Sequence, residues 1–397
     1  MTEYYVDLHV HIGCDSRGRP IKVSGSRKLT FENIAKECFY RKGIDIVGIA
    51  DAASPGVIDD IEDLINSGEM KEIVGGGIGY KDRVVILLAC EVETSEKGRG
   101  RSHHLILLRT LDLAKAFSRQ LEKCVSNVFF STPTCTMPAK DLYRLAIDTG
   151  GIPFPAHAFS PYKSIYGNCV RRLDHAFPRD ILEFIPAIEL GLSADTNLAD
   201  TISELKDYTF LSNSDAHSLP KIGREYNVML LENPSFDEVM KALRRKDGRK
   251  VSVNYGLDPK LGKYHRTYCH RCDRTFQDKL PPILACPQCN NTSVVRGVLD
   301  RIMDIQDYPD PKYPSHRPPY KYQVPLEFVP GLGPKSIDKL IMEFGSEMAV
   351  LHTAVEEELA KVVGNKAASL IVEAREGTLP LIAGGGGHYG KAALNKK

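Results

Sequence analysis

Short apolar runs alternate with amphipathic stretches along the first 250 residues. Buried strands are predicted at 4–8, 44–50, 84–90, 105–108 and 208–211, where the residues are mostly β-branched, aliphatic or aromatic. Helical patterns lie between them at 30–42, with Thr30 as the N-cap and Gly43 as the stop, and at 56–67. Strands that alternate with helices predict βα units around a parallel sheet.

Side chains that bind metals recur where these strands end. His9 and His11 are two residues apart, so they project to the same side of an extended chain. Other strand-like runs lead into the set Asp51, Glu91, His157, Glu189, Asp215 and His217, and the pair His103 and His104 precedes another run. In a closed β/α barrel the carboxyl ends of the strands meet on one rim, where active sites assemble. The sequence therefore predicts a site for a metal such as Zn²⁺ or Mn²⁺. The alternative is that these residues are solvated loop groups or helix caps.

Length and charge bound the class of protein. A chain of 397 residues exceeds one ordinary core and suggests two or three domains. No apolar run is long enough to cross a bilayer and the first residues do not resemble a signal peptide, so we expect no membrane association and a cytoplasmic location. Residues 1–258 carry 33 basic and 36 acidic side chains, whereas residues 259–397 carry 19 and 15. The positive second part is compatible with nucleic-acid contact.

Four of the ten cysteines form two Cys-x-x-Cys knuckles, which are Cys269 with Cys272 and Cys286 with Cys289. This spacing predicts a ribbon that holds one structural Zn²⁺ with four thiolates, and the metal would supply much of the folding energy of so small a module. Redox-active dithiols are the competing interpretation. The other six cysteines are scattered, as expected for reduced thiols in the cytoplasm.

Two further patterns lie nearer the C-terminus. Residues 308–325 contain six prolines and interleaved tyrosines, which predicts a stiff linker, or alternatively a platform on which bases stack. Glycines then precede a helix that is predicted to run to residue 344, and they leave backbone N–H groups free to bind an anion. The candidate DNA-binding residues are Gly331, Gly333, Lys335 and Ser336 in this first element, and Gly364 and Lys366 in a related second one.

The ordered set of histidines and carboxylates resembles the polymerase-and-histidinol-phosphatase (PHP) superfamily. The resemblance implies a distorted seven-stranded β/α barrel with two or three divalent metal ions (Zn, Mn or Mg) that cleaves phosphoester bonds. It implies one metal on His9, His11, Glu91 and Asp215, a second shared by Glu91, His104 and His157, and a third served by His217. Glu91, His157 and Asp215 would be central to catalysis.

Two choices within this resemblance rest on few residues. His104 is preferred to His103 because it adjoins the apolar strand. Many members place histidines where this chain has Ala52 and Arg17, so the third metal would rely on Asp51 and Asp15.

The C-terminal glycine motifs resemble a tandem helix-hairpin-helix domain, and the domain order as a whole resembles the endonuclease Q family. That resemblance implies damaged DNA as the partner, in the cytoplasm at the nucleoid. It implies cleavage 5′ to hypoxanthine, uracil, xanthine or an abasic site, with 3′-hydroxyl and 5′-phosphate ends. The alternatives are a 3′–5′ exonuclease, a small-molecule phosphomonoesterase and a non-catalytic DNA-binding protein.

The predicted boundaries follow from these motifs. A barrel spans 1–258, a zinc ribbon 259–300, a linker 301–325, a tandem helix-hairpin-helix domain 326–380 and a flexible basic tail 381–397. A base that is turned out of the helix would need a pocket. The candidates are Phe159, Ser160, Tyr162, Tyr166 and Asn168, in a loop that otherwise only covers the barrel mouth.

Overall fold

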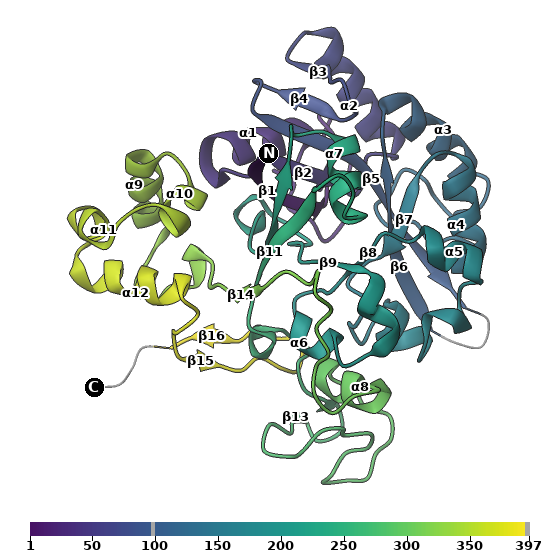
Figure 1. The fold of residues 1–397 in the computed structure, drawn as a ribbon, viewed down its shortest axis with the longest axis vertical. Helices are drawn as coiled ribbons and strands as arrows, with labels where there is room; N and C mark the ends of the chain where they lie inside the picture. The colour runs from purple at the N-terminus through teal and green to yellow at the C-terminus, as the bar shows by residue number, and fades with distance from the viewer. Residues whose placement is uncertain (97–99, 394–397) are drawn as a thin grey trace.

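A computed structural model describes residues 1–96 and 100–393 of the chain. Its first part is a mixed α/β domain built on a long, curved sheet (Figure 1). The central strands are β1 (Thr2–Val10), β2 (Ile46–Ile49) and β5 (Val84–Ser95), which pair in parallel. The predicted α/β class is therefore confirmed.

The other strands of this part extend the sheet on both sides. They are β3 (Met70–Glu72), β4 (Ile78–Tyr80), β6 (Arg101–Leu108), β7 (Ile152–Pro155), β10 (Tyr226–Leu231) and β11 (Lys250–Gly256), while β8 (Ala187–Glu189) and β9 (Thr209–Leu211) form a separate parallel pair. The expectation of a parallel sheet is only partly correct, because β5, β6 and β7 pair antiparallel. The connection from β5 to β6 is too short for a crossover helix, so the chain turns back as a hairpin.

Helices flank this sheet. They are α1 (Phe31–Glu37), α2 (Pro55–Asn66), α3 (Leu111–Leu121), α4 (Ala139–Asp148), α5 (Arg179–Phe184), α6 (Thr196–Ala199) and α7 (Phe236–Leu243). Thr30 caps α1 through its side chain, as predicted, and Gly43 in a left-handed conformation ends the turn that follows the helix. None of the described helices is long and apolar enough to cross a membrane.

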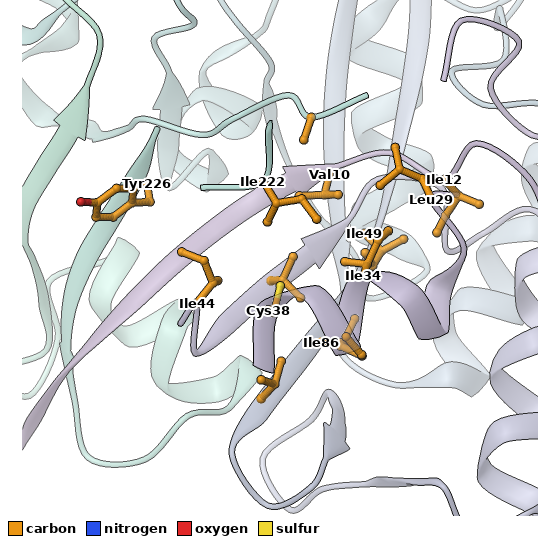
Figure 2. Close-up of a cluster of buried hydrophobic side chains, with 14 of the residues drawn as sticks. Val10, Ile12, Leu29, Ile34, Cys38, Ile44, Ile49, Ile86, Ile222 and Tyr226 are labelled. Atoms are coloured by element: carbon orange, nitrogen blue, oxygen red, sulfur yellow. The ribbon is translucent and has the colours of Figure 1, made fainter. Parts of the chain in front are cut away.

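Buried aliphatic side chains from the first strands and α1 fill the space on one side of the sheet (Figure 2). Val10, Ile49 and Ile86 from β1, β2 and β5 pack against Ile34 of α1 and Ile222, and all five are buried. This core fixes the carboxyl ends of β1, β2 and β5 relative to one another, which is where the metal-type side chains lie.

We call the α/β domain of the first part of the chain the barrel. The cysteine-rich segment forms a small lobe at its edge, with strands β12 (Tyr268–Cys269) and β13 (Arg274–Thr275) (Figure 1). The predicted boundary at residue 300 falls inside helix α8 (Val298–Ile305), which joins this lobe to the barrel. Arg301 of α8 donates hydrogen bonds to the carbonyl oxygens of Tyr166 and Val170 at 2.8 and 3.0 Å. The predicted linker also contains β14 (Tyr320–Tyr322), which pairs with β11 and so belongs to the barrel sheet.

The C-terminal helices form a separate group beside the barrel (Figure 1). They are α9 (Pro334–Phe344), α10 (Glu347–His352), α11 (Glu356–Val363) and α12 (Asn365–Arg375). Lys42 of the barrel pairs with Glu347 at 2.5 Å, and the ring of His352 stacks on Tyr5 at 4.9 Å between centroids. These contacts hold the helical group against the barrel.

The prediction of a flexible tail is wrong for residues 381–393. They form a hairpin of β15 (Leu381–Ile382) and β16 (Lys391–Ala392) that returns to the barrel, while 394–397 lie outside the described residues. The backbone N–H of Gly384 donates to the carbonyl of Lys260 at 2.7 Å, and that of Gly390 donates to Leu261 at 2.9 Å. A glycine-rich sequence suggested mobility, whereas here glycines permit close backbone contact: a Cβ at Gly390 would lie 2.4 Å from a carbonyl oxygen.

Candidate metal centre and active site

His9 and His11 converge at the end of β1, as the sequence predicts. Both are fully buried, and their Nε2 atoms are 3.3 Å apart. His9 Nδ1 lies 3.0 Å from a carboxylate oxygen of Glu189, and His11 Nδ1 lies 3.0 Å from Asp51. In each ring Nδ1 therefore donates to a carboxylate, which leaves an Nε2 lone pair directed at the same space.

This arrangement fits a bound cation. The Nε2 atoms of His9 and His11 face the same space, and Asp215 Oδ1 lies 3.3 Å from His11 Nε2. The ligand atoms of His9, His11 and Asp215 all lie within 4.8 Å of one another. Two imidazoles and a carboxylate are common ligands of Zn²⁺ or Mn²⁺.

A second group consists of Glu91, His103 and His157, whose ligand atoms also lie within 4.8 Å of one another. Glu91 Oε1 lies 3.0 Å from His103 Nδ1 and 3.2 Å from His157 Nε2. The other oxygen, Oε2, lies 3.4 Å from Nε2 of His11 in the first group. Glu91 thus connects the two groups, in the bridging position that the resemblance implied.

The two central carboxylates are held in their ionised form. Burial raises the pKa of Glu91, but the adjacent rings of His103 and His157 outweigh it and hold this pKa well below its usual value. Burial likewise opposes ionisation of Asp215, and its pKa is also well below the usual value because His11 and His9 lie beside it. Both side chains can therefore act as anionic ligands at neutral pH.

The choice of His104 over His103 is wrong in this structure. In the β5–β6 ladder His103 pairs with Glu93 and His104 with Val92, so alternation places His103 on the same face as Glu91. The ring of His104 points into the core, where Nδ1 is 2.9 Å from the Tyr143 hydroxyl, and burial lowers its pKa to about 3. Closeness to the apolar strand was a poor guide, because alternation decides which side chain enters the site.

The residues predicted for a third metal lie beside the two groups, but they do not form a third group of ligands. Asp51 orients His11 and accepts from the backbone N–H of Ile12 at 2.7 Å, and its other oxygen has no hydrogen-bond partner among the described residues. The ring of His217 lies 4.9 Å from that of His11. Asp15 is held elsewhere by Arg19 at 2.5 Å.

A cavity of about 510 Å³ opens onto these groups, which is within the range of small-molecule sites. His103, His157, Asp215 and His217 are among the residues that line it. The lining also includes tyrosines and cations, which are Tyr162, Tyr264, Tyr389, Lys163, Lys221, Arg224 and Lys263, together with serines, Asn213 and the carboxylate Glu189. Such a wall suits an anionic ligand that carries a flat ring.

Only part of the predicted base pocket reaches this cavity. Ser160 and Tyr162 line it, and Tyr162 is 47% exposed. Phe159 and Tyr166 are fully buried and stack on each other at 5.2 Å between ring centroids, so they belong to the core. Asn168 is exposed and donates to the carbonyl of Arg101 away from the cavity, which corrects the prediction for these three residues.

Tyr389 reaches the cavity from the C-terminal hairpin, which sequence reasoning treated as a tail. Its hydroxyl accepts a hydrogen bond from Arg224 at 3.0 Å, and the Lys263 ammonium lies 4.6 Å from the centre of its ring. Lys263 and Tyr264 come from the segment that leads into the cysteine lobe. The cavity is therefore assembled from three separate parts of the chain.

The four cysteines of the lobe come together as their spacing predicts. Their Sγ atoms lie within 4.8 Å of one another, with Cys269 and Cys289 at 3.8 Å and Cys272 and Cys286 at 3.7 Å. Few apolar side chains are buried with them, mainly Phe276 and Ile283. A tetrahedral metal site fits this arrangement, since four thiols would otherwise crowd a very small core.

The two glycine elements precede helices, also as predicted. Gly331 has a φ of +87° and Gly333 precedes α9, while Gly364 stands between α11 and α12. A Cβ atom built on any of these three glycines meets no atom within 4 Å. The predicted contact residues Lys335 and Lys366 are exposed and Ser336 is partly exposed, so a ligand can approach both helix starts.

Comparison with known proteins decides the family. The PHP-associated family model matches residues 195–247. The uncharacterised protein YqxK of Bacillus subtilis is 44% identical over 393 residues, which is 98% of this chain and 99% of YqxK. The crystal structure of a lesion-specific endonuclease Q from Pyrococcus furiosus superimposes with a TM-score of 0.83, at 30% identity, over 100% of this chain and 96% of that one. This chain belongs to the endonuclease Q family.

A second structure of the family has the same likeness, with a TM-score of 0.83 and 32% identity over 100% of this chain and 97% of that one. It is a complex of endonuclease Q with a 27-mer duplex that has an abasic lesion at the active site. Family membership and the two groups that share Glu91 support a nuclease or phosphoesterase activity.

Glu189 was singled out after a strand-like run but was given no role, and the structure places it beside His9 Nδ1. Two other residues of the centre, Lys22 and Thr132, were not predicted. They come from loops, and no periodicity in the sequence indicates that Lys22 reaches His11 or that Thr132 reaches Glu91. They were missed because their positions depend on how those loops fold.

Proposed function

We propose that this protein is a DNA-repair endonuclease that hydrolyses the phosphodiester bond 5′ to a deaminated base or an abasic site. The observation that carries the proposal is the pair of metal-type groups that share Glu91, beside a cavity lined by tyrosines and cations, in a chain of the endonuclease Q family. Hypoxanthine, uracil and xanthine are the proposed bases, and the products are a 3′-hydroxyl and a 5′-phosphate.

The donor sets favour two divalent ions, Zn²⁺, Mn²⁺ or Mg²⁺. His9, His11 and Asp215 would hold one ion, His103 and His157 the other, and Glu91 would touch both. Asp51 and His217 lie where they could serve a third. Bound metals in such a site lower the pKa of water and neutralise charge on phosphate oxygens. Four thiolates of the cysteine lobe would hold a structural Zn²⁺.

The chain's own residues position this centre. Glu189 and Asp51 each accept a hydrogen bond from a histidine Nδ1 and so fix the ring that presents Nε2. Glu93 holds the far nitrogen of His103 at 3.3 Å and pairs with Lys163 at 3.0 Å. The histidines are therefore oriented before a substrate arrives, which lowers the cost of reaching the reactive geometry.

We place the lesion nucleotide in the cavity beside the centre. A base that leaves the duplex exchanges its stacking neighbours for Tyr162, Tyr264 or Tyr389, and Lys221 and Lys263 offer positive charge to the flanking phosphates. Unstacking costs less at mispaired, damaged or absent bases, which favours lesions over normal pairs. The open starts of α9 and α12 would hold the duplex backbone without reading its sequence.

The test uses a labelled duplex with one hypoxanthine and an undamaged control. Each duplex is incubated with the protein and Mg²⁺, Mn²⁺ or Zn²⁺, or with a chelator, and the products are sized on a denaturing gel. We expect one nick 5′ to the lesion that needs a metal and that is absent from the control. Uracil, xanthine and abasic duplexes then rank the lesions.

Three other outcomes would contradict the proposal. A ladder that shortens from the 3′ end would indicate a 3′–5′ exonuclease. Release of phosphate from small monoesters without any nick would indicate a phosphomonoesterase, and binding without turnover would indicate a DNA-binding protein that lacks activity.

A further inference from the structure

The side chain of Lys22 enters the metal centre from the loop after β1. Its Nζ lies 3.0 Å from His11 Nε2, 3.2 Å from the Thr132 hydroxyl and 3.8 Å from Glu91 Oε2. Only 15% of the side chain is exposed. An ammonium group therefore lies among the groups that we assign to phosphodiester cleavage.

The backbone around Lys22 is fixed. Its N–H donates to the carbonyl of Ile12 at 3.1 Å, and its own carbonyl accepts from Gly25 at 2.9 Å. The preceding residue, Ile21, is buried and donates to Gly13 at 3.0 Å. Backbone hydrogen bonds thus hold the loop at Lys22, so the position of the lysine does not depend on the contacts of its ammonium group alone.

The contacts of Lys22 differ from those of a structural lysine. Lys42, which is also buried, pairs with Glu347 at 2.5 Å and donates to the carbonyl of Pro220 at 2.5 Å. The carboxylate nearest to Lys22 in an ion pair is Glu91, at 3.8 Å, and its two close acceptors are a ring nitrogen and a hydroxyl. Burying an ammonium is costly without a close anion, so this position favours a lysine that receives one from the substrate.

We propose that Lys22 is a catalytic residue that donates from Nζ to a non-bridging oxygen of the scissile phosphodiester. This inference rests on the proposed function. His11 Nε2 can serve either the ammonium or a metal ion, and an incoming phosphate gives the ammonium an anionic acceptor beside Glu91 and Asp215.

In the hydrolysis itself a water oxygen forms a bond to phosphorus and the bond from phosphorus to O3′ breaks. The water gives up one proton, the departing O3′ gains one, and the 5′-phosphate stays with the lesion fragment. Lys22 keeps its proton throughout and acts by balancing charge that grows on the phosphate oxygens.

The experiment compares Lys22→Met and Lys22→Arg with the wild type. The control is Lys28→Met, which replaces an exposed lysine in the same segment. Single-turnover nicking of the hypoxanthine duplex is measured at saturating enzyme over a series of metal concentrations, alongside duplex affinity by fluorescence anisotropy and thermal unfolding. We expect Lys22→Met to slow nicking roughly 10²–10³-fold, as for loss of one donor to a developing anion. Lys22→Arg should recover part of the rate, and duplex affinity and Lys28→Met should match the wild type.

Three results would overturn the proposal. The first is nicking by Lys22→Met at the wild-type rate. The second is a deficit that disappears when more metal is added, which would mean that Lys22 acts through metal occupancy. The third is equal loss in Lys22→Met and Lys22→Arg together with a lowered unfolding temperature, which would mean a structural role. A wild-type protein that does not nick the lesion duplex would instead refute the proposed function.

Discussion

Two adjacent histidines show what decides membership of this centre. His103 faces Glu91, whereas His104 faces Tyr143 in the core. Both residues are histidines and either would fit the motif. The register of β6 against β5 decides which of them faces the centre. At this scale the geometry of the strand outweighs the motif.

We predict that His103→Gln slows nicking of the lesion duplex by more than about 100-fold, since even residues that only orient metal ligands cost 10–100-fold when lost. His104→Gln should leave the rate unchanged, because the hydrogen bonds of its ring with the described residues lie within the core. Single-turnover rates of both variants test this, with thermal unfolding as the control for folding. A normal rate for His103→Gln and a large loss for His104→Gln would instead place His104 in the active centre.

The sequence predicted the metal-type residues that lie in strands or shortly after them. His9, His11, Glu91, His157 and Asp215 all reach the two groups, because the strands fix where these side chains point. Residues on irregular loops, such as Lys22, could not be placed in this way. Their position depends on backbone hydrogen bonds that a hydrophobic pattern does not encode.

Among the elements, strands and capped helices were easier to predict than loops. The helix after Thr30 begins where its cap predicted, whereas the loop after His157 buries Phe159 and Tyr166 that were expected to face a base. The hairpin that carries Tyr389 has glycines and small residues without a period, and its position follows from backbone contacts with 260–263. Local sequence carries little information about such long-range contacts.

The start of α9 allows a matched test of its predicted role. Gly331 and Gly345 flank this helix, both have a φ of +87°, and neither has an atom within 4 Å of a built Cβ. Alanine should strain the two positions equally. Gly331 lies at the N-terminal end of α9, which we assign to DNA phosphates, whereas Gly345 lies at the other end. Gly331→Ala should therefore weaken duplex binding several-fold, while Gly345→Ala should not.

Fluorescence anisotropy with damaged and undamaged duplexes measures both affinities. Gly331→Ala should weaken them alike, because the helix start would read the backbone and not the lesion. Equal affinities of the two variants would argue against a DNA contact at this helix.

At the scale of the whole molecule, the barrel and the helical group meet at His352. Its ring stacks on Tyr5 and lies 2.6 Å from the hydroxyl of Tyr226. Burial, with the nearby charges of Arg375 and Lys321, lowers the pKa of His352 to about 4. Since a free histidine titrates near 6.5, this contact stabilises the fold above that pH and loses its contribution as the pH falls towards 4.

We therefore predict that acid weakens this interface through His352. Between pH 6.5 and pH 4.5 the unfolding temperature of the wild type should fall further than that of His352→Phe, by on the order of a few degrees. Scanning calorimetry at several pH values measures the unfolding temperatures of both proteins. The effects of the other titrating groups are shared by the two proteins, so they cancel in the difference. Parallel curves for the two proteins would show that His352 does not titrate differently in the folded state.

The central claim is that the groups sharing Glu91 cut DNA while other parts of the molecule bind it. The most direct test is the single-turnover rate of nicking at one hypoxanthine by the wild type and by Asp215→Asn, with the bound fraction of duplex measured in the same samples. Asp215 is the carboxylate of the first group, so its replacement should lower the rate by more than about 100-fold at an unchanged bound fraction. Nicking by Asp215→Asn at the wild-type rate would show that these residues are not the active centre.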